Sequence, residues 1–385
     1  MLQKRPRVDD YRGRKWGLEC SGVQGSVLQF RRNLLAWYGK YRRELPWRLP
    51  REASAGAAVL KMVDPYHVLV SEFMLQQTQV ATVIPYFNRF IERFPDAPAL
   101  ATADEQEVLR LWQGLGYYSR ARNLQKASQK IMADFGGQVP SDAKSLRSLP
   151  GVGQYTAGAI GSIAFGKRVP ILDGNVIRVL CRLDHITSDP RQPSTQEILW
   201  ARAEEILPTK RLGDFNSALM ELGALICTPR APQCLLCPVR DQCGAFTAGD
   251  QERIPAPRKA KPTPLLKRWT ICIRHNRKWL IEQRPSRGRW AGMWQFVTIE
   301  AGKQPATARS LAGKLPIGVS EPVRLGVITH ALTHRRYQFD VYHCEALNAG
   351  LLPHDRPRRW VTPDEITRYP LPRPHLKMAA MLPAS

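Results

Sequence analysis

The chain has 385 residues, of which 43% are hydrophobic, and its 57 basic against 33 acidic residues give a formal net charge of +24. This length allows two domains with cores of their own, and the hydrophobic content excludes a disordered basic tail. No stretch approaches the roughly eighteen uninterrupted apolar residues of a transmembrane helix. The charge favours a polyanionic partner, because counterion release from phosphate would supply affinity, although a merely basic solvated surface remains an alternative.

The N-terminal part of the chain divides into a short basic segment and a long helical one. Residues 1–25 are basic and lack periodic apolar side chains, which predicts a flexible arm. From 26 to 249 the apolar spacing is typical of helices nearly throughout. We expect one helix starting near Leu28, a second running from Tyr66 to Val80, and a third beginning at Pro85.

Two glycines between helical stretches mark a candidate phosphate-binding turn. Gly151 and Gly153 flank one apolar residue, and Ser141 can cap the helix that precedes them. Such a turn exposes backbone N–H groups at the start of the next helix, Tyr155–Phe165, and can hold a phosphate without reading sequence. A Gly-x-Gly between helices can also be only a turn, so both interpretations stay open here.

Four cysteines lie within seventeen residues in the pattern C-x6-C-x2-C-x5-C, and they are Cys227, Cys234, Cys237 and Cys243. Cysteine thiolates are the usual ligands of iron–sulfur clusters and of structural zinc. Two disulfides are a third possibility, but no signal peptide is evident and the other cysteines are scattered. Zinc usually takes two C-x2-C pairs, so a single pair with wide gaps favours a cluster held by one loop. Arg230 and Arg240 inside this loop could face a phosphate backbone.

The composition changes after Phe246. Residues 250–264 are proline-rich and basic, which predicts an extended linker. Beyond this linker, four segments alternate like strands, and they are Arg268–Arg274, Lys278–Gln283, Val323–Thr329 and Tyr337–Cys344. Residues 265–385 are therefore predicted to form a second, smaller α+β domain.

Several segments resemble the MutY-type adenine DNA glycosylases, which are members of the helix–hairpin–helix glycosylase superfamily. Besides the cysteine loop (227–243), these segments are 71–80 (Ser-Glu-Phe-Met-Leu-Gln-Gln-Thr-Gln-Val), 114–120 (Gly-Leu-Gly-Tyr-Tyr-Ser-Arg) and 172–176 (Leu-Asp-Gly-Asn-Val). The resemblance runs from about Leu28 to Phe246. It implies a mainly α, helix–hairpin–helix DNA glycosylase domain with a [4Fe-4S] cluster in the cysteine loop.

The resemblance also implies two catalytic carboxyl groups. Glu72 would protonate the leaving base and then activate water, and Asp173, with Asn175 beside it, would stabilise the cation-like sugar of a glycoside-type hydrolysis. Glu72 lies among apolar residues of a predicted helix, so we expect burial to raise its pKa and keep it protonated. Taken alone, Glu72 could be a solvated helix glutamate, and Asp173 could be an N-cap.

Tyr155 bears on whether the enzyme also cuts the DNA strand. In strand-cutting relatives, a lysine at this point of the hairpin forms a Schiff base with the sugar. A tyrosine has no amine, so the resemblance implies a monofunctional glycosylase that leaves an abasic site. Lys144 and Lys167 are nearby in sequence and could substitute weakly.

A glycosylase that extrudes a base needs side chains to fill the gap in the stack. The residues that the resemblance assigns to DNA or to the adenine pocket are Trp47, Arg48, Leu75, Gln77, Tyr117, Gly151, Gly153 and Glu221. Gln77 and Tyr117 would intercalate, with Leu75 close by. Alternatively, Tyr117 and Trp47 could be core aromatics, and Gln77 a helix-surface amide.

The C-terminal region resembles the MutT-like (Nudix-type) domain with which the family reads 8-oxoguanine opposite the adenine. Residues 288–296 fit its glycine- and tryptophan-bearing segment. The acidic Nudix box is absent after Gly302, so we expect no pyrophosphatase activity. The family's Phe-Ser-His loop appears as Leu332, Thr333 and His334. Threonine keeps a hydroxyl for the lesion, whereas leucine loses an aromatic stack worth on the order of 1 kcal/mol.

Together these features predict a monomeric enzyme without a membrane partner, cytoplasmic and nucleoid-associated in the bacterial manner. It would remove adenine opposite 8-oxoguanine or guanine from double-stranded DNA by base flipping and N-glycosidic hydrolysis. Three alternatives remain: a glycosylase of another base specificity such as thymine, a strand-nicking endonuclease III-like enzyme, and a non-catalytic iron–sulfur protein that binds DNA or senses redox state. Tyr155 argues against the second, and the third predicts that Glu72 and Asp173 can be replaced without effect.

Overall fold

The computed structural model describes residues 27–50, 63–257, 262–301, 308–348, 352 and 355–382. The predicted arm (1–25), part of the predicted linker (258–261) and the start of the segment lacking the Nudix box (302–307) lie outside this range. No helix of the described part is long and apolar enough to cross a membrane.

The chain forms two compact units by spatial contact. The first consists of Met1–Arg42, Leu172–Pro208 and Ser217–Pro257, and the second of Arg43–Ile171, Thr209–Asn216 and Arg258–Ser385. The predicted boundaries at 26–249 and 265–385 remain a prediction about the domains.

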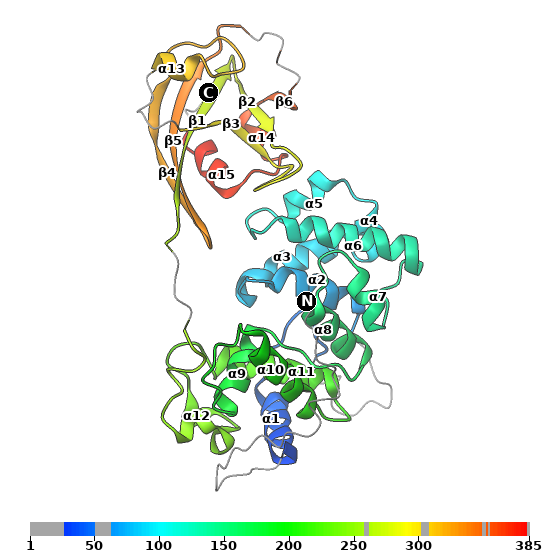
Figure 1. The fold of residues 1–385 in the computed structure, drawn as a ribbon. Helices are drawn as coiled ribbons and strands as arrows, with labels where there is room; N and C mark the ends of the chain where they lie inside the picture. Colours follow the sequence, from blue (N-terminus) through cyan, green and yellow to red (C-terminus); the bar gives the residue numbers. More distant parts are fainter. Residues whose placement is uncertain are drawn as a thin grey trace, which may run out of the picture. The chain divides into compact units, whose positions relative to one another are not determined.

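The first unit is helical. Its elements are α1 (Val27–Tyr41), α9 (Gly174–Leu183), α10 (Pro193–Glu205), two 3-10 turns, η3 (Cys234–Leu236) and η4 (Arg240–Gln242), α12 (Gly244–Thr247) and the second part of α11 (Leu212–Leu225) (Figure 1). The helix expected near Leu28 is confirmed as α1. Arg31 of α1 donates hydrogen bonds to the carbonyls of Ile206 and Leu207 at 2.9 and 3.0 Å, which ties α1 to the end of α10.

The second unit begins with seven helices. They are α2 (Pro65–Leu75), α3 (Val80–Arg93), α4 (Ala97–Ala101), α5 (Glu105–Leu111), α6 (Ser119–Phe135), α7 (Ala143–Ser148) and α8 (Gln154–Phe165) (Figure 1). Asp64 caps α2, and its carboxylate accepts the N–H of Tyr66 at 2.7 Å. Every residue of α2 from Tyr66 to Met74 except His67 is buried, and α2 packs against α3, α6 and α8. A helix that is apolar on nearly all sides is a core helix, so α2 positions whatever polar group it carries inside the unit.

Three details of the expected helices were wrong. The helix expected from Tyr66 to Val80 ends at Leu75, and α3 starts at Val80, because a turn intervenes at Gln77, whose φ is 56°. The apolar spacing concealed this break because Val80 still packs against the core that contains α2.

Proline at position 85 does not begin a helix but lies inside α3. Its missing N–H leaves the carbonyl of Ala81 without a helical partner, and Ala81 is exposed to water. The cap of α7 is Asp142, not Ser141, and its carboxylate accepts the N–H of Ser145 at 2.9 Å.

The second unit also contains a six-stranded sheet. Its strands are β1 (Leu265–His275), β2 (Lys278–Gln283), β3 (Trp294–Glu300), β4 (Val323–Leu332), β5 (Arg335–Glu345) and β6 (Arg358–Val361), in the order β4-β5-β1-β3-β2-β6. The β1–β5 pair is parallel and the other pairs are antiparallel. The four predicted strands are confirmed, whereas β3 and β6 were not predicted.

Helices cover both faces of the sheet (Figure 1). Alternation along β1 sends Cys272 to the face covered by α14 (Pro363–Ile366) and α15 (Arg373–Ala379). It sends Ile271 and Ile273 to the opposite face, where α13 (Ala308–Ala312) packs.

The predicted linker is not extended in its first part. Ile254 is only 3% exposed, and its carbonyl accepts a hydrogen bond from Arg182 Nε at 2.8 Å. The carbonyl of Asp250 accepts a hydrogen bond from the N–H of Arg253, so a turn begins at Asp250. The prediction of an extended linker was wrong for residues 250–254, because hydrogen bonds to the Asp250 carbonyl form a turn and the Ile254 side chain is buried.

Candidate active site

Glu72 lies in the middle of α2 and is 5% exposed, between the buried residues Ser71 and Phe73. The expected burial of this carboxyl group is confirmed, and a solvated helix glutamate is excluded. Burial disfavours the charged form of a carboxyl group.

The glycine turn packs directly against α2. Gly151 has φ 81°, and a Cβ atom there would lie 2.9 Å from both Asn123 Cβ and Phe73 Cε1. Only glycine therefore fits this approach to the neighbour of Glu72. Gly153 is the N-cap of α8 and is exposed, as is Gln154 after it, so backbone N–H groups at the start of α8 are open to solvent. These are the groups that a phosphate would bind.

Tyr155 is the second residue of α8 and is half-buried. Lys167 comes after α8 ends at Phe165, and its N–H donates to the carbonyl of Gly161 at 2.9 Å, so the chain turns back towards the helix there. Lys144 lies at the start of α7, away from the hairpin. That Lys144 or Lys167 could substitute weakly for the lysine of strand-cutting relatives stays a prediction.

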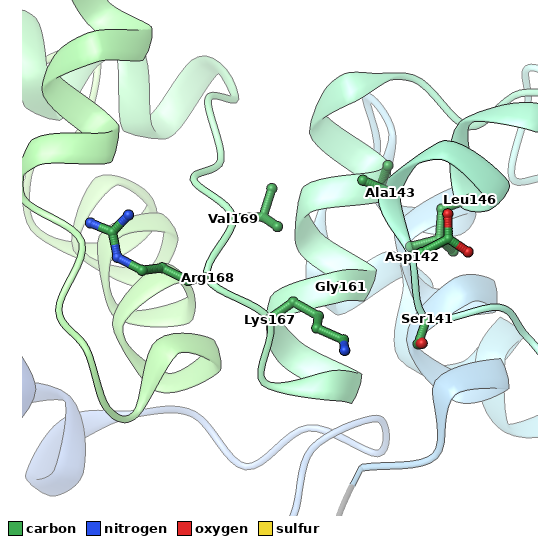
Figure 2. A pocket seen from close by; sticks show the side chains of 9 residues that line it. Ser141, Asp142, Ala143, Leu146, Gly161, Lys167, Arg168 and Val169 are labelled. Carbon is green, nitrogen blue, oxygen red and sulfur yellow. The ribbon is translucent and has the colours of Figure 1, made fainter.

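Lys167 belongs instead to a separate cavity of about 310 Å³. It is lined by the start of α7, at Ser141 and Asp142, and by the segment after α8. Figure 2 shows the Lys167 side chain directed towards the start of α7 and Arg168 directed away from it. Ala157 and Gly161 of α8 also line this cavity, which therefore extends along the helix.

Asp173 is the N-cap of α9. The alternative interpretation of Asp173 as a helix N-cap is therefore confirmed for its position in the fold. Its Oδ1 accepts the N–H groups of Asn175 and Val176 at 3.0 and 2.7 Å. Burial raises the pKa of Asp173, while these hydrogen bonds and the nearby Arg178 lower it. Capping fixes the carboxylate in one orientation, which a stabiliser of developing positive charge requires.

A chain of hydrogen bonds joins Asp173 to the cysteine loop. Asn175 Nδ2 donates to Asp173 Oδ2 at 3.0 Å, and Arg178 Nη2 donates to Asn175 Oδ1 at 2.8 Å. Arg178 Nε in turn donates to the carbonyl of Cys227 at 2.7 Å. A Cβ atom at Gly223 would lie 2.6 Å from Asn175 Cβ, so α11 packs closely against Asn175. Sequence reasoning missed Arg178, which is spaced one helical turn from Asn175.

The two side chains expected to enter DNA are both exposed and both sit in strained turns. Gln77 follows α2 with φ 56°, and Tyr117 precedes α6 with φ 47° and 42% exposure. Leu75 is the last residue of α2 and is partly buried. Gln77 is therefore not a helix-surface amide and Tyr117 is not a core aromatic.

The residues expected around the adenine pocket are mostly buried. Trp47 is 6% exposed and its ring meets that of Phe87 edge-on at 5.1 Å, so it forms part of the core. Arg48 Nη1 donates to the carbonyl of Arg43 at 3.2 Å. Glu221 on α11 is 1% exposed. Their role in base recognition remains a prediction.

Thr333 and His334 form the two-residue turn between β4 and β5, and both are exposed. The hydroxyl of Thr333 is hydrogen-bonded to the hydroxyl of Tyr117. Elsewhere in the second unit, Gln106 of α5 donates to the carbonyl of Gly292 at 3.1 Å and accepts from Trp294 Nε1 at 3.1 Å. The β4–β5 turn therefore adjoins the Tyr117 turn within the second unit, a relationship that sequence reasoning did not predict.

The four cysteines line one small cavity of about 30 Å³, together with Arg182, Phe246 and Gln251. Each is a free thiol. Burial raises the pKa of Cys237 to about 12 and also raises the pKa values of Cys234 and Cys243. No three Cys, His, Asp or Glu side chains in the described ranges are grouped closely enough to hold a single metal ion. A cluster needs no such group, because each of its irons takes its own thiolate, so the donor set fits an iron–sulfur cluster.

Arg182 is a buried partner of the cysteine loop that sequence reasoning missed. It is 2% exposed, and its Nη1 donates to Cys227 Sγ at 3.3 Å and to the Thr228 carbonyl at 2.7 Å. Of the two arginines inside the loop, Arg230 is exposed, whereas Arg240 is paired with Asp241 at 2.8 Å. Arg230 is thus the better placed of these two for contact with a phosphate.

Comparison with known proteins identifies the family. A model of the HhH-GPD superfamily base excision DNA repair proteins matches residues 70–205, and a NUDIX domain model matches residues 268–381. An adenine DNA glycosylase of Rattus norvegicus is 38% identical over 369 residues, which cover 82% of this chain and 70% of the rat protein. The chain belongs to the adenine DNA glycosylase family.

A second adenine DNA glycosylase and a solved structure of a related glycosylase are similar to this chain. The Homo sapiens adenine DNA glycosylase is 37% identical over 370 residues, covering 82% of this chain and 67% of the human protein. A solved structure of a thermostable thymine-DNA glycosylase is 29% identical, with a TM-score of 0.51, and covers 58% of this chain and 97% of that one. The resemblance and the fold class are thereby confirmed, and this family member is a DNA N-glycosylase.

Proposed function

We propose that the protein removes adenine paired with 8-oxoguanine or guanine in duplex DNA, as part of base excision repair. The observation that carries the proposal is Glu72, a carboxyl group buried to 5% exposure on a core helix next to a glycine turn suited to phosphate. The names of the rat and human relatives support adenine as the base.

The chemistry requires one proton donor and one fixed negative charge. In our assignment, the Glu72 carboxyl group gives its proton to a ring nitrogen of the adenine while the bond between that base and the sugar breaks and its electron pair leaves with the base. The Asp173 carboxylate stabilises the positive charge left on the sugar. Glu72, now ionised, takes a proton from the water that adds to the sugar, which restores the acid.

Three features support hydrolysis without strand cleavage. Tyr155 has a phenol where an amine would be needed for a Schiff base. Lys167 comes after the end of α8 opposite to Tyr155, and Lys144 lies at the start of α7. We therefore expect the wild-type protein to give no borohydride-trapped complex with DNA and to leave an abasic site.

Recognition of the opposite base is assigned to the β4–β5 turn and to Tyr117. The Thr333 hydroxyl is exposed and already bonded to the exposed Tyr117, so the two can act on one region of a duplex. His334 in the same turn adds a further polar group.

The [4Fe-4S] cluster of the proposal would be held by Cys227, Cys234, Cys237 and Cys243, which line a common cavity. When bound, it would fix the fold of the loop that presents Arg230. The cluster-bearing protein would act as a monomer on double-stranded DNA associated with the nucleoid of a bacterial cytoplasm, a proposal supported by the charge of +24.

The experiment is a single-turnover assay on a duplex panel that pairs adenine with 8-oxoguanine, guanine, cytosine or thymine, with thymine opposite guanine as a further substrate. We expect release of adenine from the first two duplexes and none from the A:T duplex. Release of thymine from the G:T duplex without release of adenine would instead favour the thymine specificity named for the solved structure.

A further inference from the structure

Arg120 is a buried cation that the assigned chemistry does not use. It is the second residue of α6 and is 6% exposed. Burial lowers its pKa to about 10, so it keeps its charge at neutral pH. Its guanidinium group lies between the turn that carries Gln77 and the turn that carries Tyr117.

One side of the guanidinium group holds the first turn. Nη1 donates to the carbonyls of Phe73, Met74 and Gln76 at 3.0, 2.7 and 2.6 Å. Two of these carbonyls are among the last of α2, where the helix dipole favours a positive charge. The third belongs to the residue immediately before Gln77, so the bond fixes the backbone at the point where the chain leaves the helix.

The other side holds both turns at once. Nη2 donates to Thr78 Oγ1 at 3.1 Å, just after Gln77, and to the carbonyls of Leu115 and Gly116 at 3.3 and 3.2 Å, just before Tyr117. The same group also lies over the Tyr117 ring, at 5.5 Å from its centroid, within the range of a cation–π contact. A single planar cation thus bridges the two segments.

Both turns need such support. Gln77 and Tyr117 have φ values of 56° and 47°, which non-glycine residues rarely adopt and which persist only where the surroundings hold them. The acceptors of Arg120 lie on both sides of Gln77 and immediately before Tyr117, while both of these side chains remain exposed. The buried hydrogen bonds of Arg120 therefore stabilise the two turns in one conformation, which fixes the positions of the exposed Gln77 and Tyr117 side chains.

We propose that Arg120 is a positioning residue that fixes the Gln77 turn and the Tyr117 turn as one rigid wedge for entry into the base stack of a mismatched duplex. The inference rests on the proposed function, because it assigns Gln77 and Tyr117 to the DNA. Rigid presentation matters because ordering two loops on binding would cost affinity.

The variant that tests this is Arg120→Lys. Lysine keeps the charge but has a compact ammonium group without the planar fork, so it cannot serve acceptors on both turns. The readout is the mismatch preference: the ratio of dissociation constants for a matched duplex and for a duplex with uncleavable 2′-fluoro-deoxyadenosine opposite 8-oxoguanine. We expect this ratio to fall about tenfold or more in the full-length variant, since several charged hydrogen bonds are lost or weakened.

The decisive comparison repeats Arg120→Lys in a Gln77→Ala, Tyr117→Ala background. If Arg120 acts through the wedge, the substitution should change the preference by less than about twofold there, because coupled residues are not additive. An equal loss in both backgrounds would overturn the inference and leave Arg120 with a general structural role. If the double alanine background itself keeps the wild-type preference, the assignment of Gln77 and Tyr117 to DNA fails, and this inference fails with it.

Gln125→Ala provides the matched control for folding. Gln125 lies on the same helix, is 5% exposed, and donates to the carbonyl of Ala103 at 2.7 Å, in a loop that carries neither Gln77 nor Tyr117. We expect this variant to lower the melting temperature while leaving the mismatch preference unchanged. A comparable loss of preference in Gln125→Ala would contradict a specific role for Arg120.

Discussion

Asn175 donates a hydrogen bond of 3.0 Å from its Nδ2 to Oδ2 of Asp173, and the same side chain accepts one of 2.8 Å from Arg178. Arg178 also binds the carbonyls of Cys227 and Gly223, both at 2.7 Å. The carboxylate assigned to the sugar cation is therefore held by side chains that are anchored on the cysteine loop. Disturbance of that loop should reach Asp173 through these bonds.

Arg178→Met should shift the acid limb of the pH–rate profile to higher pH. Burial raises the pKa of Asp173 and Arg178 opposes that rise, so removing the cation raises the pKa further. The ionised carboxylate is the active form in our assignment, so activity is lost as the pH falls through this pKa, and the loss should begin at a higher pH in the variant. The measurement is the single-turnover rate of adenine release across the acid range.

Arg202→Met is the control for Arg178→Met. Arg202 lies in the same unit, is half-buried, and pairs with Asp184 at 2.9 Å. The Arg202→Met variant should leave the acid limb of the pH–rate profile unchanged. An acid limb in Arg178→Met that stays in place or moves to lower pH would contradict the electrostatic link.

Purified protein should be brown, with broad absorbance around roughly 400 nm, because thiolate-ligated iron absorbs there. Cys237→Ala removes one of the four cysteines around the shared cavity and should reduce both the absorbance and the iron content. Cys272→Ala, at a buried position in β1, should leave both unchanged. Colourless wild-type protein that contains one zinc and no iron would refute the cluster.

Thr333→Val should reduce the preference for 8-oxoguanine over guanine opposite the adenine. Loss of the hydroxyl leaves a partner group unsatisfied, which is worth roughly 1–3 kcal/mol, or about 5- to 150-fold. The measurement is the ratio of single-turnover rates on the two duplexes. Thr329→Val, at an exposed position of β4, is the control. An unchanged ratio in Thr333→Val would show that another group reads the opposite base.

Structural features that depend on the local pattern of apolar and polar residues could be predicted from the sequence. Glu72 was predicted to be buried because apolar residues surround it on one helix. Four strands were predicted from the order of apolar and polar residues in the sequence. The strand β3 was not predicted, and its first four residues are all buried. The short strand β6 carries two arginines and has the composition of a loop.

The contacts that organise the site could not be read from pattern. Arg120 and Arg178 look like ordinary basic residues of helices, and only the fold brings carbonyls from distant segments to them. The break at Gln77 was missed because Val80 keeps the apolar spacing of α2 across the turn. The bond between Tyr117 and Thr333 joins residues 216 positions apart, a separation at which local propensities carry no information.

The most direct test of the account is Glu72→Gln, an isosteric change that removes the proton donor and preserves the packing of α2. Glu92→Gln, at an exposed position of α3, serves as the matched control. We expect Glu72→Gln to bind the A:8-oxoguanine duplex like wild type but to lose single-turnover adenine release by several orders of magnitude. Glu92→Gln should retain adenine release. Adenine release by Glu72→Gln within about tenfold of the wild-type rate would contradict the central role of this buried carboxyl group.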